Sequence, residues 1–275
     1  MPSLVPRGAR WLIGVVHLRP LPGSPRWDGR WEGVVRQAVA DAQAYARGGA
    51  DALELENFGD LPFAKHSVPP VTVAGMAAAG CSVRAACRLP LGFNVLRNYA
   101  RAALALCAVC DGAFIRVNVH TGAMVTDQGL IEGDACTTLR QRASLCPRVA
   151  ILADVHVKHA VPLAPISIER AALDTWRRGL ADGLIISGTG SGEATDPDQV
   201  KRVRAACPEA TILIGSGVRR ENLAAYLPFA DAFIVGSSLK RGGRIAQPVD
   251  WRRVAALKRS LDRYPRPGVG PRVAQ

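Results

Sequence analysis

Three polar side chains alternate along a predicted strand over residues 149–157, and their types suit proton transfer. Asp154, His156 and Lys158 stand two residues apart, and valines occupy the positions between them. Because side chains alternate between the two faces of a strand, these three would share one face. A carboxyl and an ammonium group at a strand end can exchange protons with a substrate. The pattern predicts Asp154 and Lys158 as catalytic residues.

Other apolar runs carry polar residues in the same arrangement. Glu54 and Glu56 alternate along a second predicted strand, and we predict Glu56 as a further catalytic carboxylate. Glu54 and Arg116 also suit an ion pair deeper in the fold, and His17 has a purely structural alternative. The residues predicted to bind substrate lie at strand ends or in the loops that follow, and they are His17, Asn57, Asn94, Arg116, Asn118, Asp127, His156 and Ser187.

Two consecutive apolar runs near the C-terminus end in glycine and serine. Residues 211–214 lead into Gly215-Ser216-Gly217, and residues 232–235 lead into Gly236-Ser237-Ser238. Glycine lets the backbone approach a ligand closely, and the N–H groups at a following helix start attract anions. The alternative is that these turns only join strands to helices. We predict a phosphate site formed by both turns, with Lys240 adding positive charge.

Eight apolar runs are each followed by a segment of helical periodicity. This alternation predicts a parallel sheet, and eight such units predict a single closed (β/α)8 TIM barrel. A doubly wound sheet is the alternative, but the first run lacks the G-x-G-x-x-G fingerprint of a dinucleotide fold. The predicted strands cover residues 12–18, 51–56, 91–95, 113–119, 149–157, 183–186, 211–214 and 232–235.

The same strand count gives the expected domain organisation. We predict one barrel domain at residues 11–262, between an N-terminal tail at 1–10 and a disordered Pro/Gly tail at 263–275. The two Gly/Ser turns follow the seventh and eighth predicted strands, where barrels of this kind bind phosphate. The loops after the first, second and fourth strands are long enough to form a lid over the site.

The composition limits the expected partners. The 275-residue chain has a formal net charge of +12, which suits a phosphorylated small molecule but also reflects an arginine-rich composition. No basic run carries interleaved aromatic residues, so nucleic acid is not an expected partner. No apolar run approaches the roughly 20 residues of a membrane span. Seven cysteines with a single close pair predict reduced thiols in a cytoplasmic protein.

No cofactor and no metal are predicted. A site made of Asp154, His156 and His17 is conceivable, but the chain has neither a His-x-His nor a His-Glu-x-x-His spacing. Whether the chain forms a homo-oligomer is left open.

Seven segments are long enough to carry a resemblance to known proteins: IGVVHLRPLPGSP (13–25), ENFGDLPF (56–63), GFNVLRN (92–98), IRVNVHTGAMVTDQGLIEG (115–133), ADVHVKHA (153–160), IGSGV (214–218) and IVGSSLK (234–240). Together they resemble the BtpA family over nearly the whole predicted barrel. The family is named after a cyanobacterial factor needed for stable photosystem I, and it has members in non-photosynthetic bacteria and archaea. One bacterial member lies among sugar-metabolism genes. The resemblance implies a TIM barrel with a phosphosugar-like ligand, while the family's catalytic residues are unassigned.

One position departs from the family pattern. Members often follow the asparagine of the VLRN motif with aspartate, whereas this chain has Tyr99. If that aspartate contacts ligand in the family, the substrate of this chain would differ.

The main hypothesis is an enzyme acting on a phosphorylated sugar or nucleotide-like metabolite. Cleavage or transfer of a glycosidic bond and isomerase or lyase chemistry both fit the predicted residues. Two alternatives belong to other classes: a non-catalytic assembly or stability factor, which the family name suggests, and a barrel that binds a phosphometabolite without turnover.

Overall fold

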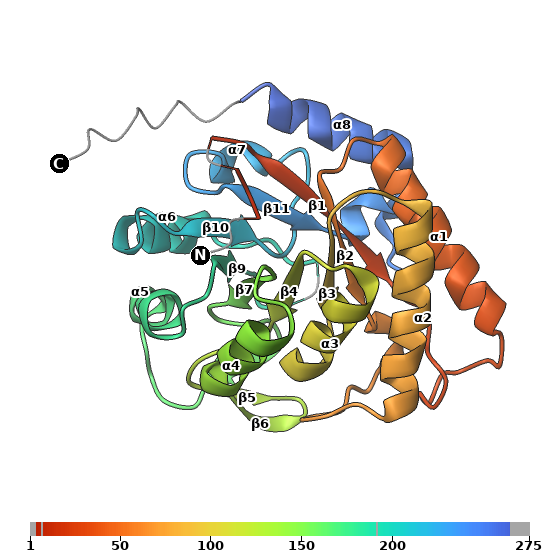
Figure 1. The fold of residues 1–275 in the computed structure, drawn as a ribbon. Helices are drawn as coiled ribbons and strands as arrows, with labels where there is room; N and C mark the ends of the chain where they lie inside the picture. The colour runs from red at the N-terminus through yellow and green to blue at the C-terminus, as the bar shows by residue number, and fades with distance from the viewer. Residues whose placement is uncertain (1–3, 7, 191, 265–275) are drawn as a thin grey trace.

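Eight parallel strands close into a barrel, as the alternation of strands and helices predicted. The computed structural model describes residues 4–6, 8–190 and 192–264 (Figure 1). Around the barrel the strands are ordered β1-β11-β10-β9-β7-β4-β3-β2, so the first and last strands pair and close it. Their bounds are β1 Trp11–His17, β2 Ala52–Glu56, β3 Leu91–Asn94, β4 Phe114–Val117, β7 Ala150–Asp154, β9 Gly183–Ile186, β10 Thr211–Ile214 and β11 Ala232–Val235.

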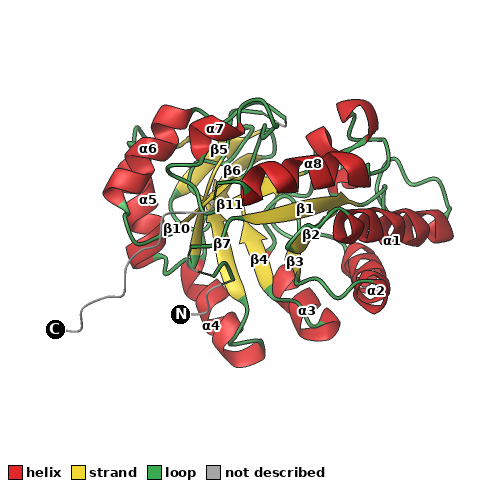
Figure 2. Cartoon of the chain, turned by 90° about the horizontal axis from the view of Figure 1, so that it is seen from above, coloured by secondary structure: helices red, strands yellow, loops and turns green. Residues whose placement is uncertain are grey.

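Helices surround the barrel on its outside, as the view from above shows (Figure 2). The helix at 197–206 begins as its sequence indicates, because Asp196 accepts a hydrogen bond from the Asp198 amide and Pro197 occupies the first turn. The helices are α1 Trp31–Arg47, α2 Pro70–Ala86, α3 Ala100–Cys110, α4 Ala135–Leu145, α5 Ile168–Leu173, α6 Pro197–Ala206, α7 Leu223–Tyr226 and α8 Trp251–Asp262. Short helical turns are η1 Phe58–Asp60, the π-helical η2 Asp174–Arg178, η3 Ser237–Leu239 and η4 Arg241–Gly243.

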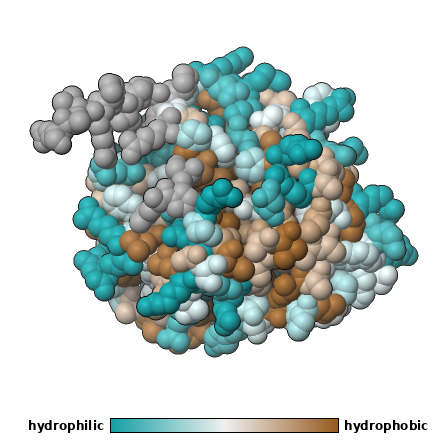
Figure 3. Space-filling view, viewed as in Figure 1, coloured by the Kyte–Doolittle hydropathy of each residue, from teal (hydrophilic) through white to brown (hydrophobic). Residues whose placement is uncertain are grey.

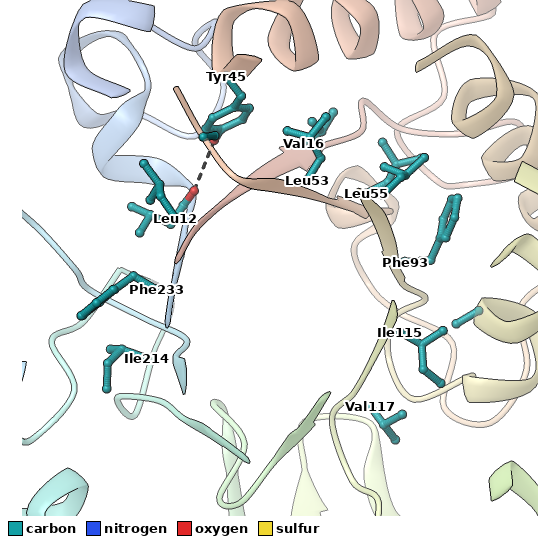
Figure 4. Close-up of a cluster of buried hydrophobic side chains, with 14 of the residues drawn as sticks. Leu12, Val16, Tyr45, Leu53, Leu55, Phe93, Ile115, Val117, Ile214 and Phe233 are labelled. Carbon is teal, nitrogen blue, oxygen red and sulfur yellow. Dashed lines mark hydrogen bonds between the residues drawn. The ribbon is translucent and has the colours of Figure 1, made fainter. Parts of the chain in front are cut away.

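The main hydrophobic core lies between the barrel and these helices. Alternate residues of each strand point outward, and Figure 4 shows Val16, Leu55 and Phe93 among the buried side chains of this layer. Tyr45 of α1 reaches the barrel wall, where its hydroxyl donates to the carbonyl of Val15 at 3.0 Å. A Cβ at Gly14 would lie 2.3 Å from the Tyr45 ring, so β1 needs glycine at this position.

A second, smaller apolar cluster fills the inside of the barrel. It includes Ile13, Phe114 and Leu213, and Val5 packs into it from the predicted N-terminal tail. Above this cluster, towards the C-terminal ends of the strands, the inside of the barrel contains polar and charged side chains. The predicted Pro/Gly tail lies almost wholly outside the described residues, because the description ends at Tyr264.

Two regions differ from the sequence-based prediction. The fifth barrel strand, β7, ends at Asp154, whereas residues 149–157 were predicted as one strand. The loop after β4 is not irregular: β5 Ala123–Thr126 and β6 Gly129–Glu132 form a hairpin, and β8 Ala160–Pro162 pairs with β5. This small antiparallel sheet stands over the barrel mouth because it joins the loops that follow β4 and β7.

The surface carries hydrophilic residues over much of the face in Figure 3, with apolar residues between them. Among the described residues, no helix has the length and apolar character that crossing a membrane requires.

Candidate functional site

Asp154 and Arg116 form the floor of the barrel mouth. Arg116 Nε and Nη2 donate to the two carboxylate oxygens of Asp154 at 2.9 and 3.0 Å. Asp154 also accepts from Asn118 Nδ2 at 3.0 Å and from Ser187 Oγ at 3.1 Å. Strands β4, β7 and β9 are neighbours, so their ends bring these four residues together. The Asp154 side chain is completely buried, and these four hydrogen bonds occupy both of its oxygens.

Glu54 lies on the other side of Arg116. Arg116 Nη1 is 3.3 Å from Glu54 Oε1, which confirms the ion pair expected from the sequence. Burial raises the pKa of Glu54 to about 7, and the attraction of Arg116 offsets only part of this effect. Glu54 Oε2 has no hydrogen-bond partner among the described residues. Glu54 is thus a buried carboxyl group close to its protonation midpoint at neutral pH.

Glu56 faces the open part of the mouth. Its Oε2 accepts a hydrogen bond from Asn94 Nδ2 at 2.7 Å, and its Oε1 lies 3.9 Å from His17 Nε2. Burial lowers the pKa of His17 well below its usual value, and the charges of Lys240, Lys158 and Arg116 act in the same direction. The imidazole is therefore neutral at pH 7, and its contact with Glu56 is not an ion pair.

Lys158 reaches the mouth from beyond the end of β7. Its Nζ is 3.3 Å from the carbonyl oxygen of Gly215, at the start of the first Gly/Ser turn. Burial lowers the pKa of Lys158, and Arg116 adds to this effect, while the nearby carboxylates oppose it. A lysine in this environment is more easily deprotonated than one in water, which suits acid–base or covalent chemistry.

Both Gly/Ser turns line one cavity at the mouth. The cavity has a volume of about 60 Å³, and Gly215-Ser216-Gly217 and Gly236-Ser237-Ser238 lie on its wall together with His17, Glu56 and Lys158. Such a volume holds about two water molecules or one small anion. The sequence-based prediction that the two turns lie side by side is confirmed in its geometry, because β10 and β11 are adjacent strands.

Several amide groups of these turns are available to a ligand. Within the described part of the chain, the amides of Gly217, Ser237 and Ser238 donate no hydrogen bond. Ser237 begins the helical turn η3, where backbone N–H groups lack partners within the helix. Gly217 has a φ of +65°, and a Cβ there would lie 2.2 Å from the Glu193 carbonyl oxygen. Ser237 is therefore the better position for mutation, because a side chain at Gly217 would disrupt the turn itself.

A second cavity adjoins the first at Glu56, Arg116 and Lys158. It has a volume of about 280 Å³ and contains polar and aromatic side chains. Its other lining residues are Phe58, Leu61, Phe63, Asn94, Leu96, Arg97, Asn118, Asp127 and His159. Asp127 lies at the tip of the β5–β6 hairpin, which brings this predicted residue over the mouth.

Other predicted residues lie away from these cavities. His156 lines a separate, mainly apolar cavity with Thr121 and Met124, because the strand ends before it and the alternation predicted for residues 149–157 stops. Asn57 supports the loop after β2, where it donates to Asp60 at 3.1 Å and accepts from the Leu96 amide at 2.8 Å.

Two further expectations from the sequence have different outcomes in the structure. Lys240 does not line the phosphate cavity, because its Nζ is buried 3.1 Å from Asp41 Oδ2, and its charge reaches the cavity only through its effect on His17. Tyr99 packs against the main core at the start of α3, and it lines none of the cavities described above. The unusual residue at this position is thus not in contact with either cavity of the mouth.

Arg97 and Arg219 are site residues that the sequence reasoning missed. Arg97 is almost fully buried and lines the second cavity, and Arg219 lines the first. The signal for Arg97 was present in the GFNVLRN segment, directly after β3. Among the described residues, no three or more His, Cys, Asp and Glu side chains are grouped so that they could hold a metal ion.

Comparison with known proteins identifies relatives of the whole chain. Residues 9–263 match the sequence model of the BtpA family. The photosystem I biogenesis protein BtpA of Synechocystis is 45% identical over 246 residues, covering 90% of this chain and 86% of the relative. A protein of Pyrococcus furiosus is 42% identical over 251 residues, with 90% and 93% coverage.

Solved structures share the fold at low sequence identity. Thiamine phosphate pyrophosphorylase of Pyrococcus furiosus superposes with a TM-score of 0.59 at 11% identity, covering 94% of this chain and 98% of that one. Phosphoribosyl anthranilate isomerase of Thermus thermophilus gives 0.57 at 14% identity, with 92% and 98% coverage. Tryptophan synthase of Mycobacterium tuberculosis gives 0.60 at 19% identity, with 95% and 94% coverage. At these identities the likeness is one of fold.

Proposed function

Because this chain belongs to the BtpA family and forms a barrel with two Gly/Ser turns on one cavity, we propose that it is an enzyme of phosphorylated metabolites. Its substrate is a phosphorylated sugar or a nucleotide-like molecule. A single observation carries the proposal: the cavity lined by both turns also contains Glu56 and Lys158. An anion held by the turns would therefore have reactive side chains beside it.

The phosphate group binds at the amides of Gly217, Ser237 and Ser238. These N–H groups have no other partner among the described residues. Arg219, at the rim, supplies a full positive charge, and Lys158 adds a second one in its protonated form. The wall formed by the two Gly/Ser turns is thus complementary in charge to a phosphate dianion.

The reaction takes place where the two cavities meet, at Glu56 and Lys158. We favour cleavage or transfer at the anomeric carbon of the sugar, since the Glu56 carboxylate can stabilise positive charge on that carbon. The bond to the leaving group breaks with its electron pair, the leaving group takes up a proton, and water or an acceptor adds to the carbon. Asp154 holds Arg116 in place and acts as a positioning residue, because its oxygens are already occupied.

Schiff-base chemistry is the second candidate, favoured by the lowered pKa of Lys158. In that case the amine of Lys158 adds to a carbonyl carbon of the substrate and water leaves. Borohydride reduction in the presence of substrate would trap the adduct as a mass increase on Lys158. Cleavage at an anomeric carbon through Glu56 leaves no such adduct.

The phosphate site is tested by Ser237→Asp, with Ser144→Asp as the matched control on the exposed surface of α4. A carboxylate at Ser237 would repel the anion, so we expect its affinity for inorganic phosphate and ribose 5-phosphate to fall about tenfold or more, by isothermal titration calorimetry. The control should bind as wild type does. Equal affinities in all three proteins would place the anion elsewhere.

Turnover is tested by screening phosphosugars and nucleotides as substrates. An active wild type that loses activity in Glu56→Gln supports the proposal. Binding without turnover across the whole panel would instead support a ligand-binding barrel or an assembly factor, as the name of the Synechocystis relative suggests for that protein.

A further inference from the structure

The second cavity of the mouth is built differently from the phosphate cavity. It opens on the side of Glu56 and Lys158 away from the Gly/Ser turns, and its volume of about 280 Å³ is several times larger. Apolar side chains line much of it, with Phe58, Phe63 and Leu96 among them. No Gly/Ser turn contributes to this wall, so the cavity suits the other end of a substrate whose phosphate lies on the turns.

Asn118 presents a hydrogen-bond acceptor to this cavity. Its Nδ2 donates to Asp154 Oδ2 at 3.0 Å, and Asp154 is held in turn by Arg116. This bond fixes the orientation of the amide, because the carboxylate can only accept. Asn118 Oδ1 is buried without a partner among the described residues, although a buried carbonyl normally has one. A ligand with an N–H group would complete it.

Arg97 presents a donor to the same cavity. Its side chain is nearly fully buried, and Nη2 donates to the carbonyl oxygen of Lys158, which holds the guanidinium in place. Arg97 Nε has no partner in the described part of the chain. The wall of the cavity therefore contains one unpartnered acceptor and one unpartnered donor, which is the pattern that a cyclic amide edge satisfies.

Aromatic rings bound the space in front of these groups. The ring of Phe58 lies 6.3 Å from that of Phe63 at an angle of 60°, and 5.0 Å from His17 at 69°. Edge and face of such rings pack well against a planar heteroaromatic group. Base–aromatic stacking contributes to nucleotide binding and accepts any base, because every base has a π-face.

We propose that this cavity binds a planar, uncharged heterocycle with a cyclic amide edge, attached to the phosphosugar and donating its N–H to Asn118. The inference rests on the proposed function and defines the second half of its substrate. A carboxylate or a second phosphate fits less well, because it would bring an acceptor against Asn118 Oδ1. The cationic side chains of the cavity, Arg97, Arg116 and Lys158, already donate to oxygens of the protein. The substrate is therefore of the nucleoside monophosphate class.

The test compares three probes by isothermal titration calorimetry: ribose 5-phosphate, uridine 5′-monophosphate and its N3-methyl derivative. Ribose 5-phosphate carries the phosphate end alone, and methylation removes the donor while keeping the ring. We expect wild type to bind the uridine nucleotide at least about tenfold more tightly than ribose 5-phosphate, and methylation to remove most of this advantage. Inosine 5′-monophosphate offers the same edge on a larger ring and repeats the comparison for purines.

Asn118→Ala should lose the advantage of the nucleotide and keep its affinity for ribose 5-phosphate within about threefold, because the phosphate turns are on other strands. Should this variant fail to fold, as judged by its melting curve, Arg97→Met tests the same cavity with the same expectation. If wild type binds ribose 5-phosphate but neither nucleotide more tightly, this inference is overturned and the phosphate site stands. If wild type binds none of the probes, the proposed function fails and this inference with it.

Discussion

Two buried groups of charges in the described part of the chain differ in whether each of their polar atoms has a hydrogen-bond partner. In the first, Lys240 Nζ lies 3.1 Å from Asp41 Oδ2, and both side chains are almost inaccessible to solvent. Asp41 also accepts from the Val249 amide at 2.9 Å and from Gln37 Nε2 at 2.5 Å. This Lys240–Asp41 pair ties the segment after β11 to α1 and to the start of α8.

The second group, Arg116 with Glu54 and Asp154 at the mouth, is incomplete at its edges. Glu54 Oε2 and, next to the group, Asn118 Oδ1 and Arg97 Nε are buried without partners among the described residues. A buried polar atom without a partner is destabilising, by roughly 1–3 kcal/mol. The fold tolerates several of them in one place, at the open end of the barrel. The comparison supports a structural role for the first group and the proposed ligand-binding role for the second.

The largest expected effect is the loss of protein stability when the Lys240–Asp41 pair is broken. Asp41→Ala leaves the buried Lys240 ammonium without its counter-charge and should lower the free energy of unfolding by about 3–5 kcal/mol. Urea unfolding followed by circular dichroism measures the change. In contrast, the double variant Asp41→Leu with Lys240→Met removes both charges and should recover most of the loss. If Asp41→Ala alone were as stable as wild type, the pair would not stabilise the fold.

Next in size is the effect of the mouth residues on turnover. Glu56→Gln and Lys158→Met should each lower kcat on the order of 10²-fold or more, the usual contribution of acid–base catalysis. Both should melt close to wild type, since neither residue belongs to a completed buried pair. Asp154→Asn should also lose activity, through a displaced Arg116.

A positioning role of Asp154 can be separated from a catalytic one by the pH–rate profile. If Asp154 only holds Arg116, both limbs of the kcat/KM profile persist in Asp154→Asn, because the proton-transferring groups are still present. The limb of Lys158 should move to lower pH, because the charge of Asp154 raises the pKa of Lys158 in wild type. Loss of one limb of the profile in this variant alone would return Asp154 to the catalytic role predicted from sequence.

The fold could be predicted from the sequence because its signals are local. Each barrel strand is a short apolar run, and each ends near polar or glycine residues whose position in the chain gives their position around the barrel. The two Gly/Ser turns follow the seventh and eighth strands of the barrel, and this position predicts that they share one cavity. Alternation along β2 and β4 predicts that Glu56, Arg116 and Asn118 lie at the mouth.

The features that could not be predicted depend on contacts between residues that are distant in the sequence. Lys240 and Asp41 are 199 residues apart, so nothing near Lys240 indicates that its charge is taken up by α1. The end of β7 at Asp154 depends on the chain turning to reach β8, which pairs with a hairpin from another loop. That turn separates His156 from Lys158, although their spacing suggested one face.

A smaller effect than the loss of turnover is expected in the pH dependence of stability, and it comes from Glu54 at the mouth. The pKa of Glu54 is raised from 4.5 to about 7 in the folded protein, so the folded state binds this proton more tightly than the unfolded state. The contribution of Glu54 to stability is complete below pH 4.5 and is lost as the pH rises to about 7.

Glu54→Gln removes this titration. The difference in unfolding free energy between the variant and wild type should therefore increase in favour of the variant from pH 5 to pH 8. Urea unfolding at four pH values in this range measures it, and taking the difference cancels His17 and the other groups that titrate there. A difference that is constant with pH would show that Glu54 is ionised throughout.

The smallest expected effect is in the loops over the mouth. It would sharpen the contrast, because Phe58 and Asp127 of these loops line the cavity next to the incomplete group. We predict that ligand protects the loops after β1, β2 and β4 from proteolysis. Trypsin can cut the first two at Arg26 and Lys65, and a glutamate-specific protease can cut the hairpin at Glu132. Arg88, between α2 and β3 at the opposite end of the barrel, is exposed and serves as the internal control.

Ribose 5-phosphate should slow cleavage at the mouth sites several-fold and leave cleavage at Arg88 unchanged. The reason is that Phe58 and Asp127 line the second cavity from two of these loops, so a bound sugar removes the space into which the loops open. Cleavage at such sites follows the population of the open form when opening is fast relative to cutting. Equal slowing at Arg88 would indicate a general stabilisation of the barrel, and no slowing at the mouth sites would show that these loops do not close over the ligand.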